Sequence, residues 1–154
     1  MNITITRRID FCAGHRVCGH ESKCQHLHGH NYTALVTVRR MIVETTNLRS
    51  EQRTFTDPLD HLGRVIDFSV VKTRVGGWIE KRWDHKFLMW TDDPLCQHLE
   101  AISPHSVVRT ALNPTAENLG IMLRNVAADL LAPDGVEVIG IAIHETPNCY
   151  AEIT

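Results

Sequence analysis

The chain has 154 residues, of which 43% are apolar and 22% are charged, close to the averages for folded soluble domains. Sixteen Lys and Arg residues against eighteen Asp and Glu residues give a formal net charge of -2 without blocks of like charge, so neither nucleic acid nor membrane is expected as a partner. The length suits one domain over residues 1–154, and because no signal peptide or membrane span is recognisable, we expect a cytoplasmic protein.

Residues that can bind metal are unusually numerous. The chain contains ten histidines and five cysteines. An odd number of cysteines without a secretion signal indicates free thiols rather than a disulfide framework. Six of the histidines fall within the first 61 residues, at positions 15, 20, 26, 28, 30 and 61. This crowding is the first indication of a metal site.

Two alternating segments near the N-terminus predict two strands. Residues 3–15 place most of their apolar side chains at odd positions, and His15 shares that parity. Residues 32–38 have their apolar set at even positions, and His28 and His30 share it. If the second strand extends back through these histidines, both imidazoles project from one face, about 6.6–6.8 Å apart along the strand. We expect the two strands to pair antiparallel.

The middle of the chain predicts one irregular stretch and a first helix. Residues 41–63 contain Thr56-Asp57-Pro58 and are typical of a long hairpin tip or an insertion. The helix that follows has Asp67 or Ser69 as its candidate cap, and Gly76-Gly77 weakens it. Its apolar positions are Val70, Val71, Val75, Trp78, Ile79 and Trp83.

A second helix and a closing hairpin complete the predicted elements. The helix has Thr115 as its cap and an apolar stripe below it, and Pro133 and Gly135 end it. Residues 136–153 are rich in Val and Ile and are interrupted at 146–148, which indicates a hairpin. The order β-β-α-α-β-β predicts an α+β fold in which two helices cover one face of a four-stranded antiparallel sheet.

The segment from Cys24 to His30 holds four potential metal ligands in seven residues. Neutral imidazole is a good zinc donor, and a catalytic zinc usually keeps three protein ligands and one open position. The spacing does not decide whether His15, His20 or His26 joins His28 and His30. A four-ligand site that includes Cys24 would instead make the chain a zinc-stabilised binding module without catalysis.

Six segments in order along the chain resemble the motifs of the 6-pyruvoyl-tetrahydropterin synthase family. They are Phe11-Cys12-Ala13-Gly14-His15-Arg16, residues 23–32 (K-C-x-x-x-H-G-H-N-Y), Val65-Ile66-Asp67-Phe68, Asp84-His85 with Leu88, residues 113–118 (N-P-T-x-E-N) and His144-Glu145-Thr146. A competing Asp60-His61 lies before the third of these segments, whereas the family pair follows it. The stretches 41–63 and 91–112 are longer than the family pattern.

This resemblance implies a T-fold whose subunits form trimeric barrels that stack as hexamers. It also implies that His15, His28 and His30 hold zinc and that Cys24 is the general base that removes a carbon-bound proton from the substrate. Lys23 and the zinc ion would favour the thiolate form of that cysteine.

The remaining roles also come from the resemblance. Asp84 would orient His85 in a proton relay with Cys24, and Glu145 would anchor the pterin by accepting two N–H bonds. Thr115 and Glu117 are weaker candidates for contact with the same ring, since a helix cap and a first-turn acid explain them equally well. No Lys or Arg is singled out for the triphosphate.

Two family reactions start from 7,8-dihydroneopterin triphosphate. In the 6-pyruvoyl branch the substrate loses triphosphate and rearranges, whereas in the 6-carboxy branch its side chain is also cleaved, releasing acetaldehyde on the route to queuosine and other 7-deazaguanines. Three residues separate Cys24 from His28 here, whereas the 6-pyruvoyl branch typically has five. Residues 146–150 also lack the E-T-D-N-N run of that branch. Both features favour the 6-carboxy reaction.

Overall fold

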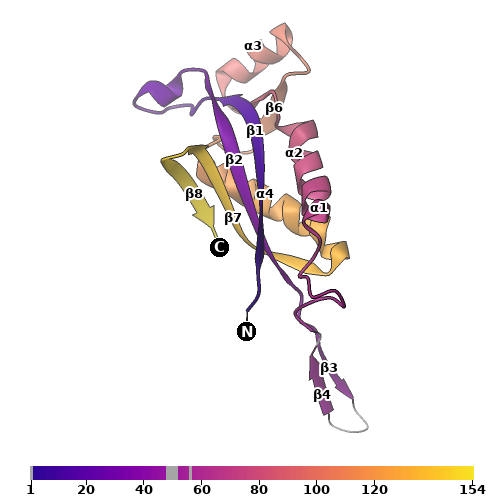
Figure 1. Cartoon of the computed structure of the whole chain (residues 1–154). Coiled ribbons are helices and arrows are strands. Elements are labelled where there is room, and N and C mark those ends of the chain that lie inside the picture. Colours follow the sequence, from indigo (N-terminus) through magenta and orange to yellow (C-terminus); the bar gives the residue numbers. More distant parts are fainter. Residues whose placement is uncertain (1, 48–51, 56) are drawn as a thin grey trace.

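The computed structural model describes residues 2–47, 52–55 and 57–154. A long curved sheet has the strand order β6-β5-β1-β2-β7-β8, and a separate hairpin, β3-β4, projects from one end of the molecule (Figure 1). The strands are β1 Ile5–His15, β2 His28–Arg40, β3 Glu44–Asn47, β4 Gln52–Phe55, β5 Lys86–Trp90, β6 Val107–Thr110, β7 Val136–Thr146 and β8 Cys149–Ile153. The α-helices are α1 Phe68–Val71, α2 Gly77–Arg82, α3 Pro94–Ile102 and α4 Ala116–Leu131.

The predicted α+β class is confirmed, but the predicted four-stranded sheet is wrong. The four expected strands are β1, β2, β7 and β8, and their pairs are antiparallel as predicted. The sheet contains two further strands, β5 and β6, which run parallel to β1. β5 pairs only with the last three residues of β1, 13–15, and β6 pairs with β5. These strands have five and four residues, too few to show a period of two, and α3 separates them. The sheet is therefore mixed and has six strands.

The predicted hairpin in residues 41–63 is present as β3 and β4, while residues 48–51 and 56 lie outside the described part of the chain. None of the described helices combines the length and the apolar run that crossing a bilayer requires.

The pairing of β1 with β2 places the three histidines next to the hydrophobic core. His15 lies opposite His28, and Ala13 lies opposite His30. The same face of β2 continues with Tyr32 and then with Ala34, Val36 and Val38, all fully buried under α1, α2 and α4 (Figure 1). Because side chains alternate strictly along a strand, burying this apolar set forces the three imidazoles onto the same face.

The helices that cover this face begin as predicted. The Asp67 carboxylate accepts a hydrogen bond from the backbone N–H of Ser69 at 2.8 Å and caps α1. The predicted single helix runs without a break over residues 68–82, and a π-helical turn at residues 72–76 joins α1 to α2. Thr115 caps α4 by accepting a 3.3 Å hydrogen bond from the N–H of Asn118. The helical turn at residues 132–134, which follows α4, ends at Gly135 with φ of 72°.

Two glycines let β1 and β2 run closely past each other between the histidines. Gly14 and Gly29 lie opposite one another. A Cβ atom on Gly29 would lie 2.9 Å from the carbonyl oxygen of Ala13, and one on Gly14 would lie 2.5 Å from the ring of Phe87. Neither contact is compatible with a larger residue, which explains in physical terms why a glycine separates His28 from His30.

Candidate functional site

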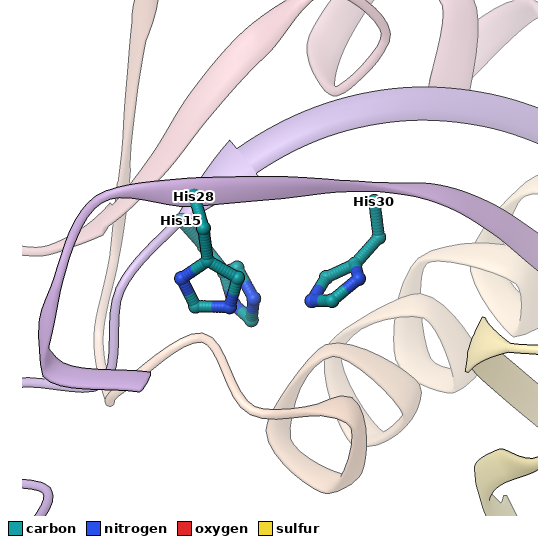
Figure 2. Close-up of side chains that lie close together, drawn as sticks. All are labelled: His15, His28 and His30. Carbon is teal, nitrogen blue, oxygen red and sulfur yellow. The ribbon is translucent and has the colours of Figure 1, made fainter. Parts of the chain in front are cut away.

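Three imidazoles meet at the end of β1 and the beginning of β2, and Figure 2 shows them pointing toward one another. The ring centroids are 4.5 Å apart for His15 and His28, 5.1 Å for His15 and His30, and 5.0 Å for His28 and His30. One nitrogen from each ring lies within 4.8 Å of the other two. This spacing suits three nitrogens that converge on one metal ion.

Backbone carbonyls orient two of the rings. His15 Nδ1 lies 2.7 Å from the carbonyl oxygen of Pro114, and His28 Nδ1 lies 2.8 Å from that of His26. A carbonyl can only accept, so Nδ1 carries a proton in both rings, and Nε2 is the nitrogen left to face a metal ion. An outer hydrogen bond of this kind is typical of histidines that ligate metal through the other nitrogen.

Two of the three candidate ligand nitrogens have no hydrogen-bond partner. The Nε2 atoms of His15 and His30 are buried and make no hydrogen bond to any described residue. Burial lowers the pKa of His15 to about 4, although the bond to Pro114 opposes the shift, and burial followed by the nearby His28 lowers the pKa of His30. Both rings are therefore neutral near pH 7, the form that binds metal. The donor set fits a metal ion.

A pocket of about 250 Å³ adjoins the histidines. It brings together five of the predicted site residues besides His15, from segments far apart in the sequence: Cys24, His28, Thr115, Glu117 and Glu145. Two other hollows are larger. One, of about 820 Å³, lies between β1 and the helices α1 and α2. The other, of about 630 Å³, is lined by residues of β1 and β2 and by Phe87. Neither of them includes Cys24 or Glu145. The smaller pocket is therefore the candidate substrate site.

Glu145 lies near the end of β7 and faces the metal group. Its Oε1 atom is 4.0 Å from Nε2 of His15. Burial raises the pKa of Glu145, and the negative charge of Glu117 in the same pocket adds to the rise. A half-buried carboxylate in such surroundings gains from a ligand that brings N–H donors, since these bonds replace lost contact with water.

Cys24 is held on a short helical turn, Lys23–Gln25, at the rim of the pocket. Its carbonyl oxygen accepts a 2.8 Å bond from the N–H of Val17. The Asn113 side chain fixes the same loop, because it accepts from the N–H of Cys18 at 2.8 Å and donates to the Cys18 carbonyl at 3.0 Å. The half-buried Cys24 thus stands beside His28 on an ordered loop.

The structure places Asp84 and His85 outside this pocket. Asp84 Oδ1 accepts from the N–H of Cys12 at 2.8 Å, and its Oδ2 lies 3.0 Å from Nδ1 of His85. Burial pushes the pKa of Asp84 upward, but the hydrogen bonds from Cys12 and His85 leave it lowered overall. The His85 side chain is 80% exposed on a backbone with φ of 57°, a left-handed conformation uncommon outside glycine. The pair is formed, but neither residue lines the pocket that contains Cys24; His85 lines the hollow of about 630 Å³ together with His28 and His30.

Four pocket residues were not predicted from the sequence: Val17, Ala116, Cys149 and Tyr150. The pocket also includes His20, which was one of the candidate metal ligands. Tyr150 stacks on His144 with ring centroids 4.5 Å apart. His20 belongs to the His-rich segment, so composition gave a signal for it, but it is not part of the metal group. The exposed His26 contributes only its carbonyl to His28.

The fold and site define a class: an α+β protein with a three-histidine group that can hold a metal ion beside a small pocket containing a thiol and carboxylates. The sequence profile of the 6-pyruvoyl tetrahydropterin synthase family matches residues 4–154, and the chain belongs to that family. The resemblance described above is thus confirmed.

Individual relatives cover the chain almost completely. The 6-carboxy-5,6,7,8-tetrahydropterin synthase of Rickettsia bellii is 35% identical over 98% of this chain and 99% of its own length. A protein of Halobacterium salinarum named probable 6-carboxy-5,6,7,8-tetrahydropterin synthase is 32% identical over 98% and 86%.

Solved structures share the fold. An uncharacterized protein from Wolinella succinogenes superimposes with a TM-score of 0.78 at 24% identity, covering 99% of this chain and 98% of the other. The 6-pyruvoyl tetrahydropterin synthase of Caenorhabditis elegans gives a TM-score of 0.63 at 21% identity, covering 99% and 94%.

Proposed function

We propose that the chain is a zinc-dependent lyase that converts 7,8-dihydroneopterin triphosphate and one water molecule to 6-carboxy-5,6,7,8-tetrahydropterin, releasing triphosphate and acetaldehyde, in the queuosine/7-deazaguanine pathway. The observation that carries the proposal is the pocket that joins the histidine group to Cys24 and Glu145. The names of the bacterial and archaeal relatives and the short spacing between Cys24 and His28 support the 6-carboxy reaction over the 6-pyruvoyl reaction.

His15, His28 and His30 would hold the zinc ion. Three converging imidazoles beside an open pocket match the usual ligand set of catalytic zinc. When bound, such an ion acts as a Lewis acid that polarises oxygens of the substrate side chain and acidifies the adjacent C–H bonds.

The chain's own residues would orient the pterin and move its protons. Glu145 would accept hydrogen bonds from the 2-amino group and a ring nitrogen, fixing the ring with its side chain toward the histidines. Cys24, which lines the same pocket, would take the carbon-bound proton as thiolate. Thr115 and Glu117 border the ring site, although the Thr115 hydroxyl already caps α4.

The two remaining residues of the predicted relay lie outside the Cys24 pocket of the single chain. Asp84 and His85 do not line the pocket that contains Cys24, and His85 projects into solvent. We therefore propose that the homo-oligomer brings the Asp84–His85 pair of a neighbouring copy to Cys24. An exposed, locally strained histidine held by a hydrogen-bonded aspartate suits this role, since such strain persists where function requires it.

Mixed oligomers test this arrangement. Cys24→Ala and His85→Ala should each lower turnover by about a hundredfold, the low end of general acid–base contributions. If the relay joins two copies, co-expression of the two variants in equal amounts should restore about a quarter of the wild-type activity, because random assembly pairs an intact Cys24 with an intact His85 at that frequency. A co-expressed mixture as inactive as its components would place the relay within one chain.

The reaction itself is tested by incubating the zinc-loaded protein anaerobically with 7,8-dihydroneopterin triphosphate. Acetaldehyde and the pterin product are followed together, with His28→Ala as the matched inactive control. Acetaldehyde in stoichiometric amounts with 6-carboxytetrahydropterin is expected. Accumulation of 6-pyruvoyl-tetrahydropterin without acetaldehyde would assign the alternative family reaction, and no turnover with zinc bound would favour a zinc-stabilised binding module.

A further inference from the structure

A buried ion pair connects the end of β1 to the beginning of α3. Asp93 is only 2% exposed, and its Oδ1 atom caps α3 by accepting from the N–H of Leu95 at 2.8 Å. The Arg16 guanidinium grips the same carboxylate with two nitrogens: Nε donates to Oδ2 at 2.6 Å and Nη2 donates to Oδ1. The bond from Arg16 holds the pKa of Asp93 below its ordinary value, so the pair is charged near neutral pH. A two-pronged grip of this kind fixes the guanidinium plane.

The third arm of Arg16 reaches the turn that carries Cys24. Its Nη1 atom donates to the carbonyl oxygen of Gln25 at 3.4 Å, and the N–H of the next residue, Val17, donates to the carbonyl of Cys24 at 2.8 Å. Two consecutive residues after His15 therefore hold two consecutive carbonyls of the Cys24 turn. Since Asp93 fixes the Arg16 guanidinium, the place of the turn depends on a residue 77 positions after Arg16.

We propose that Asp93 is a positioning residue for Cys24, acting through Arg16, and that the segment 91–112 supports the catalytic turn. This gives a role to a segment that the family pattern left without one. The consequence for catalysis rests on the proposed function of Cys24 as base, whereas the mechanical coupling between Asp93 and the Cys24 turn does not. Small displacements of a catalytic group of about 1 Å can change rates about a hundredfold, so a loosened turn should be visible in turnover.

Asp93→Asn separates this role from simple capping of α3. Asparagine caps helices about as well as aspartate, so α3 keeps its N-terminal bond while the charged grip on Arg16 is lost. The matched control is Glu100→Gln, which breaks another ion pair of the same segment, between Glu100 on α3 and Arg109 on β6, without touching the turn. Arg16→Lys is the second test variant, because lysine keeps the charge but lacks the two-pronged geometry.

The first readout is the rate at which iodoacetamide alkylates each cysteine, followed peptide by peptide in the full-length protein. Cys24 is half-buried on the turn, and Cys149 lines the same pocket from β8, so Cys149 serves as an internal control. In Asp93→Asn and Arg16→Lys the Cys24 rate should rise at least about threefold while the Cys149 rate stays unchanged. The second readout is turnover: kcat should fall about tenfold or more with KM nearly unchanged and zinc retained. Glu100→Gln should behave as wild type in both.

Unchanged Cys24 alkylation and unchanged kcat in both test variants would overturn the proposal, as would equal acceleration of Cys24 and Cys149, which indicates general loosening. Failure of the proposed reaction is distinguishable. If the wild type does not turn over the pterin triphosphate, the alkylation readout still decides whether Asp93 holds the Cys24 turn.

Discussion

Replacing His28 with alanine should remove the bound metal ion and abolish turnover of the pterin triphosphate together. The variant leaves two imidazoles where three converge. Removing a residue that only hydrogen-bonds to a metal ligand typically weakens metal affinity by about 10- to 100-fold. Removing a ligand itself should therefore weaken metal affinity by more than this factor. Because His28 is only half-buried at the start of β2, the fold should persist. Metal content by elemental analysis and thermal unfolding of the same sample measure both effects.

His26→Ala is the matched control for this change. His26 is exposed and supplies only its backbone carbonyl to His28, so its replacement should leave metal content and turnover close to wild type. Full metal occupancy in His28→Ala, or loss of metal in His26→Ala but not in His28→Ala, would contradict the ligand assignment.

Replacing Cys24 with alanine should abolish turnover while the metal stays bound. The thiol lines the pocket but does not belong to the histidine group, so its loss removes a base and leaves the three ligands in place. General bases contribute about a hundredfold or more, and kcat should fall by at least that factor. Kinetics and metal analysis on one preparation test both parts.

Cys18→Ala is the control for a cysteine on the same loop. Cys18 is bound to Asn113 through backbone atoms, which the substitution keeps, so activity should change little. If Cys24→Ala loses its metal ion, Cys24 is a metal ligand. That result would favour a zinc-stabilised binding module without catalysis.

The central sheet and the metal group could be predicted because their signals are local. Strand alternation fixes which face a residue occupies, so the parity of His28 and His30 with the apolar set of β2 was enough to place these two imidazoles on one face. Alternation could not choose between His15, His20 and His26. The structure decides for His15, which the family resemblance had indicated.

The remaining features depend on contacts that sequence patterns do not encode. The strands β5 and β6 are short and parallel, and the Arg16–Asp93 pair joins positions 77 residues apart without any periodic signal. The order of motifs suggested Asp84 and His85 as partners of Cys24 but could not show that they lie outside the pocket that contains Cys24. That placement requires the three-dimensional fold, and it is the reason why we propose a relay between two copies of the chain.

Reconstitution with zinc tests the central claim most directly. The protein is stripped with a chelator, zinc is added back in steps, and bound zinc and turnover of 7,8-dihydroneopterin triphosphate are measured at each step. We expect no turnover without metal and a linear rise that saturates at about one zinc per chain, as three histidine ligands and an open position predict. The triple variant His15→Ala, His28→Ala, His30→Ala should show neither binding nor turnover. Full turnover by the stripped protein, or one tightly bound zinc per chain in the triple variant, would contradict the account.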